Sequence, residues 1–141
     1  MVMRLYTLLL FILFSLTVST DIEAKSKKDK GVYIFTCGES LNDSTSYVSG
    51  IFFFPQLKEN KKTHYLEQSP VFSEQFRHYL QNIFNDHFAC VTFSNTKKAK
   101  LEKQLLKLRR HHEKRIKGNL PSKLVDIPAD NFKLTYTSPT E

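Results

Sequence analysis

The chain has 141 residues, of which 21 are Lys or Arg and 14 are Asp or Glu, so its formal net charge is +7. This length fits one domain with one modest hydrophobic core. The sequence contains none of the motifs typical of P-loop, dinucleotide-binding, α/β-hydrolase or zinc-protease sites. It therefore assigns no catalytic residue and no cofactor.

The first 24 residues have the layout of a secretory signal peptide. Arg4 gives a basic start, residues 5–18 are an uncharged, mostly apolar run, and small or polar residues follow. A membrane anchor is the alternative, but a spanning helix needs about 20 apolar residues and this run has fourteen. We expect residues 1–24 to be cleaved, leaving an exported chain, periplasmic or secreted, without a transmembrane span.

Two strands are predicted after the cleavage site. Residues 25–30 form a charged lead that we expect to be flexible. Residues 32–37 (VYIFTC) and 47–54 (YVSGIFFF) are rich in β-branched and aromatic side chains, as strands prefer, and Pro55 ends the second run. Gly50 inside that run predicts a β-bulge or a close backbone approach.

A helix is predicted next. Ser69 as N-cap and Pro70 in the first position indicate where it begins. Apolar residues then recur at helical spacing and define one face. These residues are Phe72, Phe76, Tyr79, Leu80, Ile83 and Phe84. Residues 88–93 (FACVTF) predict a third strand.

A second, basic helix is predicted from a cap at Asn95 or Thr96 to about Lys117, where Gly118 closes it. Residues 96–117 contain ten bases and two acids. At about 100° per residue, five cations fall within an arc of about 80°, and we call them the basic ridge. The ridge consists of Lys103, Lys107, Arg110, Lys114 and Lys117, and the opposite arc holds Leu101, Leu105, Leu108, His112 and Ile116.

The end of the chain completes an α+β pattern. Residues 123–127 and 132–136 offer one last strand, or two, and we expect a disordered tail over 137–141. The order β-β-α-β-α-β predicts a single two-layer α+β domain over residues 31–136. Its sheet should be mostly antiparallel, with two helices on one face.

Cys37 and Cys90 are the two cysteines of the chain. An even number in an exported protein predicts a disulfide. The alternative is a reactive or metal-binding thiol, for which His87-x-x-Cys90 has a tolerable ligand spacing, but no further ligand pair completes a site. We therefore predict a disulfide and no metal, which would also remove Cys37 as a nucleophile.

The basic ridge has two interpretations. It is either a solvated face that keeps the protein soluble or a docking face for an acidic partner. Candidate partners are an anionic envelope component, such as a lipid headgroup or lipopolysaccharide, and an acidic protein. Nucleic acid is disfavoured because no aromatic residue interleaves the ridge to stack a base. We expect the apolar arc to face the core, with His112 as a histidine at the core edge.

Two other function classes remain open. A small secreted hydrolase could use the loop carboxylates Glu39, Asp43 and Glu59, if two of them shared a pocket. An inhibitor-like protein–protein module would instead present an exposed apolar patch from Tyr47, Phe52 or Phe54.

The order of several landmarks resembles that of a group of small exported bacterial proteins of unassigned function. The landmarks are a first strand ending in Cys37, the sequence Tyr-x-Ser-x-x-Phe at residues 47–52, a strand with Cys90, and a helix with an early Ala99. The resemblance implies a location in the bacterial envelope and supplies no catalytic residue. The leading prediction is a small exported, disulfide-bonded, non-enzymatic binding domain.

Overall fold

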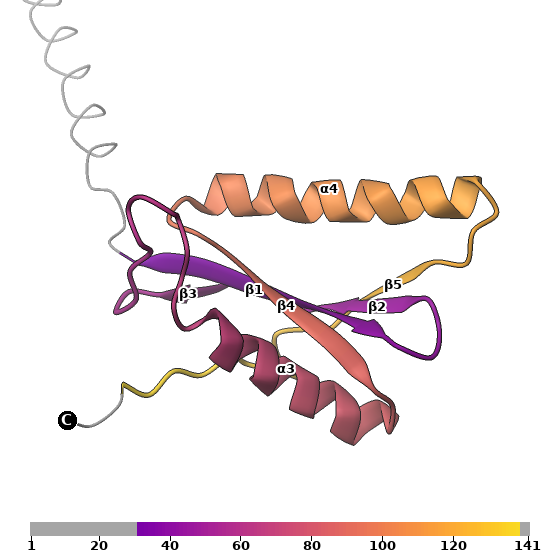
Figure 1. The fold of residues 1–141 in the computed structure, drawn as a ribbon, viewed down its shortest axis with the longest axis horizontal. Coiled ribbons are helices and arrows are strands. Elements are labelled where there is room, and N and C mark those ends of the chain that lie inside the picture. Colours follow the sequence, from indigo (N-terminus) through magenta and orange to yellow (C-terminus); the bar gives the residue numbers. More distant parts are fainter. Residues whose placement is uncertain (1–30, 139–141) are drawn as a thin grey trace, which may run out of the picture.

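The computed structural model describes residues 31–138, which form five strands and two helices (Figure 1). The elements in chain order are β1 (Val32–Ser40), β2 (Thr45–Val48), β3 (Phe52–Phe54), α3 (Ser69–Phe84), β4 (Phe88–Asn95), α4 (Lys98–Lys117) and β5 (Lys123–Asp126). The predicted signal peptide and flexible lead lie outside the described residues, as do the last three residues of the predicted tail. No helix within the described range is long and apolar enough to cross a membrane.

β1 is the centre of one mostly antiparallel sheet. Along one side its residues 33–40 pair with all eight residues of β4, and along the other side it pairs with β2 and β3 in turn. β5 adds to β2 in parallel, which is the one parallel pairing of the described sheet. The predicted α+β class and mostly antiparallel sheet are therefore confirmed.

The two helices cover opposite faces of the sheet, so the prediction that both lie on one face was wrong (Figure 1). Val32 and Ile34 of β1 pack in the same cluster as Phe72 of α3. Phe35, the residue after Ile34 in β1, packs instead with Leu101 of α4. Successive strand residues point to opposite faces, so the consecutive apolar residues of β1 require a cover on both sides.

A β-bulge divides the predicted second strand into β2 and β3. The Ser49 N–H donates to the Thr36 carbonyl at 2.9 Å, and Phe52 is the partner of Ile34. Gly50 and Ile51 therefore stand opposite the single residue between these partners, which confirms the predicted bulge. The extra residue changes the side-chain phase: Val48 packs under α4, whereas Phe52 packs against the cluster under α3.

α3 confirms the predicted helix, with two differences at its N-terminal end. Gln68 occupies the N-cap position instead of Ser69, and no side chain caps the first turn, although Pro70 lies there as expected. Phe72, Phe76 and Leu80 are fully buried, while Ile83 is 53% exposed. The apolar face thus leaves the sheet in the last turn.

The segment after β5 packs on α3. The further strand that residues 132–136 offered in the sequence does not form. Leu134 is buried, and the ring of Phe132 lies 4.7 Å from that of Tyr79, centroid to centroid. The Gln75 side chain donates to the carbonyl of Thr135 and accepts from its N–H. These two bonds use backbone groups that a strand would offer to a neighbouring strand.

Candidate binding surfaces

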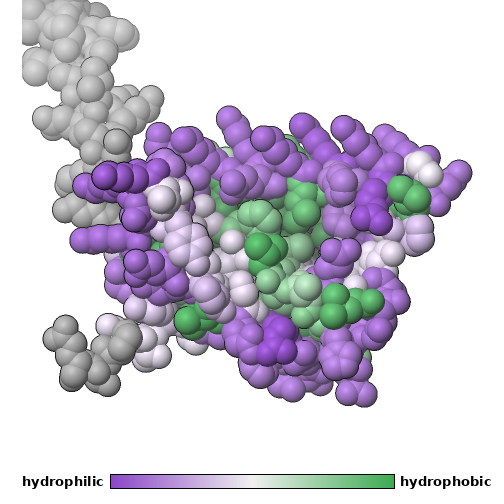
Figure 2. All heavy atoms as spheres, viewed as in Figure 1, coloured by the Kyte–Doolittle hydropathy of each residue, from purple (hydrophilic) through white to green (hydrophobic). Residues whose placement is uncertain are grey.

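The basic ridge lies on the outer face of α4, and all five of its side chains are exposed. Figure 2 shows hydrophilic residues along the whole length of this helix. No carboxylate within residues 31–138 forms an ion pair with a ridge cation. Like charges at i,i+4, such as Lys103 and Lys107, cost about 0.2–0.5 kcal/mol per pair. These repulsions oppose formation of the helix, and only the ridge cations of the last turn, Lys114 and Lys117, gain from the helix dipole.

The apolar arc of α4, opposite the ridge, packs the helix against the sheet. Leu101 is fully buried, and Leu105 and Leu108 are half-buried. Ile116, expected in the same stripe, is 55% exposed because the last turn passes beyond this contact. The guanidinium of Arg109 donates two hydrogen bonds, of 3.1 and 2.6 Å, to the Asp126 carboxylate on β5.

His112 confirms the prediction of a histidine at the core edge. It is 8% exposed, and its Nδ1 hydrogen-bonds the Ser122 hydroxyl. Burial lowers its pKa, and the neighbouring His111 and Arg115 act in the same direction. The ring is therefore neutral at pH 7, which suits a buried imidazole.

The predicted disulfide between Cys37 and Cys90 was wrong: both cysteines are free thiols. In the register of β1 and β4, Cys37 is the partner of Val91, and Cys90 is the partner of Gly38. The two cysteines thus differ by one position and point to opposite faces. Cys37 packs under α4, and Cys90 packs against the cluster of Phe76 on α3. Two Cβ atoms that point apart cannot be bridged.

Neither thiol has the environment of a catalytic nucleophile. Burial raises the pKa of Cys37 to about 11, and Glu39 adds to the shift. The pKa of Cys90 is also raised to about 11, and burial is the largest cause. A reactive cysteine needs an electropositive site that stabilises the thiolate. His112 and Cys37 line the same cavity, but the imidazole Nδ1 is bonded to Ser122.

The other candidates from the sequence are separated in space. Glu39 and Asp43 lie at the end of β1 and in the following turn, whereas Glu59 follows β3, which pairs with the start of β1. Neither described cavity is lined by two of these carboxylates. His87, just before β4, is exposed, and no group of three potential metal ligands occurs in the described part of the chain.

The three aromatic residues of the proposed inhibitor-like patch are largely covered. Phe54 is 8% exposed and Phe52 is half-buried against the same cluster. The ring of Tyr47 stacks on Phe84 at 4.5 Å between centroids.

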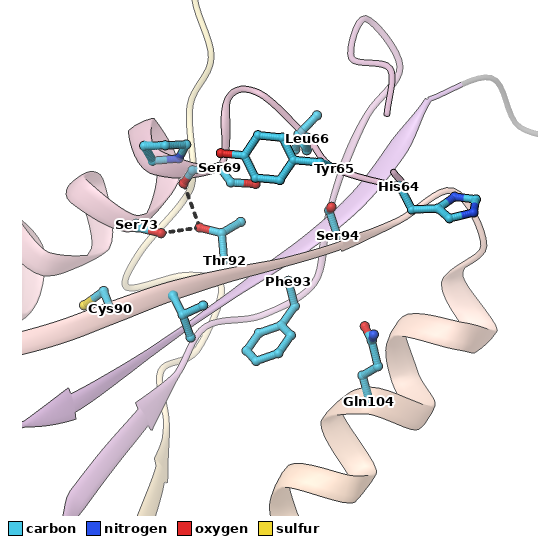
Figure 3. Close-up of a pocket in the computed structure, with 12 residues that line it drawn as sticks. His64, Tyr65, Leu66, Ser69, Ser73, Cys90, Thr92, Phe93, Ser94 and Gln104 are labelled. Carbon is cyan, nitrogen blue, oxygen red and sulfur yellow. Dashed lines mark hydrogen bonds between the residues drawn. The ribbon is translucent and has the colours of Figure 1, made fainter. Parts of the chain in front are cut away.

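A groove along β4 is the feature that the sequence did not indicate. One cavity, of about 570 Å³, reaches from Tyr65, before α3, and Ser69, the first residue of α3, to Gln104 of α4. It crosses Thr92 and Phe93 of β4. In Figure 3 Thr92 points toward Ser69 and Ser73, and Phe93 points toward the helix that carries Gln104. The Thr92 hydroxyl donates to the Ser69 carbonyl at 3.0 Å.

A second cavity, of about 340 Å³, continues along β4 beneath the last turns of α4. It shares Cys90, Val91 and Phe93 with the first cavity and adds His111 and Arg115 from the helix. We call the two cavities together the β4 groove. Figure 2 shows a band of hydrophobic residues here, between the hydrophilic surfaces over α4 and α3. No family model, curated protein or solved structure matches the chain.

Proposed function

We propose that the chain is a small exported, non-enzymatic binding domain whose basic ridge docks an acidic partner. The observation that carries this proposal is the set of five exposed cations, without an ion-pair partner within residues 31–138, on one side of a helix fastened to the sheet. Export rests on the sequence of residues 1–24. A fixed row of cations attracts polyanions and loses that attraction as salt rises.

The proposal is tested by titrating the chain with polyglutamate and, separately, with vesicles of anionic phospholipid over a series of salt concentrations. A ridge variant carries Lys103, Lys107, Arg110 and Lys114 changed to Gln. The matched control loses the same charge from exposed lysines elsewhere, at Lys58, Lys61, Lys62 and Lys133.

The ridge variant should bind at least one of the two probes much more weakly than the control does. Each Lys or Arg near an anionic surface contributes about 1 kcal/mol, so four changes predict a loss of about 1,000-fold. Its affinity should also depend less steeply on salt. If the two variants bind alike, only total charge matters and the ridge is a solvated face.

A further inference from the structure

β4 is an edge strand whose outer edge is open. It pairs with β1, and no strand of the described chain pairs with its other side. The Leu41 N–H donates to the His87 carbonyl at 2.9 Å, so the pair of Leu41 and His87 is hydrogen-bonded across the two strands. Antiparallel pairs alternate between bonded and non-bonded. Ala89, Val91 and Phe93 therefore direct their backbone groups to β1.

The alternate residues direct their N–H and C=O groups to the open edge. These residues are Phe88, Cys90, Thr92 and Ser94. The bond between Ser49 and Thr36 on the far side of β1 fits the same alternation. The open edge thus offers four donors and four acceptors at the spacing of a further strand.

The β4 edge also lacks the usual protections against strand addition. Native edge strands are short, charged, bulged or interrupted by Pro. β4 is eight residues long, and its sequence, FACVTFSN, contains no charged residue and no Pro. Val91 at its middle is 50% exposed. A long, uncharged edge at the floor of a groove is a suitable site for an extended peptide.

The walls of the β4 groove determine the charge of that peptide. His111 and Arg115 line it, and the Nε of Arg115 is buried without a hydrogen-bond partner among the described residues. At about 100° per residue, Lys100 and Lys107 lie within about 40° of His111, on the same flank of α4. Both lysines are exposed. Glu39 is the one carboxylate that lines either cavity.

This charge disfavours two other occupants. A second copy pairing β4 with β4 would bring two cationic flanks of α4 together. The lead of this chain, residues 25–30 (KSKKDK), is itself basic. Like charges at an interface oppose binding, whereas carboxylates on an extended partner would meet the cations of the flank.

We propose that the open edge of β4 accepts an extended acidic peptide of a partner protein as an additional strand. The inference rests on the proposed function, because the cationic helix that docks an acidic partner also forms one wall of the groove. It adds the partner's class and conformation: a polypeptide in β conformation whose acidic side chains lie toward α4.

Amide hydrogen exchange of the purified chain tests strand addition directly. The probe is a synthetic peptide of eight residues in which Glu alternates with Val, matched to the eight residues of β4. At a free peptide concentration ten times Kd, exchange at Cys90, Thr92 and Ser94 should slow about tenfold. The amides of Val91 and Phe93 already bond to β1, so their exchange should change little.

This odd–even pattern separates the inference from the proposed function. Binding that depends on the ridge but protects none of the three amides would overturn strand addition and leave ridge docking intact. A counterpart peptide with Lys in place of Glu should bind far more weakly, and equal binding would refute the choice of an acidic occupant. Protection that rises with protein concentration without peptide would show that a second copy occupies the edge.

A pair of variants at one position completes the test. Ser94→Pro removes a single N–H from the open edge and leaves the bonds to β1, because Pro is tolerated where an edge N–H faces outward. It should weaken peptide binding at least about threefold. The matched control Ser94→Thr keeps the N–H and should bind normally. Equal binding by the two variants, each with an unchanged melting temperature, would contradict the proposal.

Discussion

Gly38→Ala should destabilise the domain strongly, although nothing in the backbone conformation requires glycine there. A Cβ at this position would lie 2.5 Å from Leu80 Cδ1, 2.9 Å from Cys90 Sγ and 3.5 Å from Phe76 Cε1. Carbon atoms in contact are normally about 3.5–4.0 Å apart, so the methyl group would overlap Leu80 by about 1 Å. Leu80 and Phe76 are fully buried and cannot swing into solvent.

The expected loss is that of an overpacked core, about 1–3 kcal/mol in the free energy of unfolding. For a domain of about this size, this loss lowers the melting temperature by roughly 5–15 °C. Urea denaturation and thermal melting both measure it. Gly50→Ala is the matched control, since its Cβ would approach Ala129 Cβ at an ordinary 3.5 Å.

A double mutant locates the strain. Adding Cys90→Ala to Gly38→Ala removes the sulfur from the crowded site, so the two changes should couple by about 0.5–3 kcal/mol. Gly38→Ala as stable as the wild type would refute the packing, and strict additivity with Cys90→Ala would refute the contact with the sulfur. The assignment of Gly38 and Cys90 to the α3 face, on which the rejection of the disulfide depends, would then be wrong as well.

Three further predictions concern the thiols, the link between α4 and β5, and the buried histidine. Cys37 and Cys90 should remain two thiols by mass under oxidising conditions, and a mass two hydrogens lighter would contradict this. Both should react slowly with thiol reagents at pH 8 until urea exposes them, because burial raises both pKa values to about 11. Arg109→Ala should cost about 0.2–1 kcal/mol in urea unfolding, since its pair with Asp126 is largely exposed, and no further loss should follow when Asp126→Ala is added. The pKa of His112 is lower in the fold than in the unfolded chain, so its contribution to stability should be complete above about pH 6.5 and disappear as the pH falls through the folded pKa. His112→Gln should flatten that part of the stability profile, and an unchanged profile would exclude the histidine as its cause.

Local pattern was sufficient to predict the two helices and most strand positions. In α3, Phe72, Phe76 and Leu80 recur at helical spacing, and the structure buries these three residues. In α4, apolar and basic arcs lie opposite each other. This pattern predicted both the face of the helix that packs on the sheet and the exposed ridge. The bulge was predictable because Gly50 interrupts an otherwise regular strand. These signals depend on residues a few positions apart, whose neighbours are fixed by the geometry of one element.

The errors arose where distant segments meet. The sequence VYIF of β1 does indicate burial on both faces, so the helices could have been assigned to opposite sides. The disulfide depended on a register that no local pattern reveals: a shift of one residue between β1 and β4 moves a cysteine to the other face. The segment around Leu134 has a strand-like composition, yet it packs on α3.

The sequence by itself determined the class of the fold and the cationic face of α4, because helical and strand periodicities are local and charge is carried by residue type. Only the tertiary structure decided that Cys37 and Cys90 point apart, that α4 and α3 lie on opposite faces, and that β4 is an edge. Strand pairing joins residues about 50 positions apart along the chain, such as Gly38 and Cys90. Which edge remains open therefore follows from the whole sheet, and with it the location of the groove.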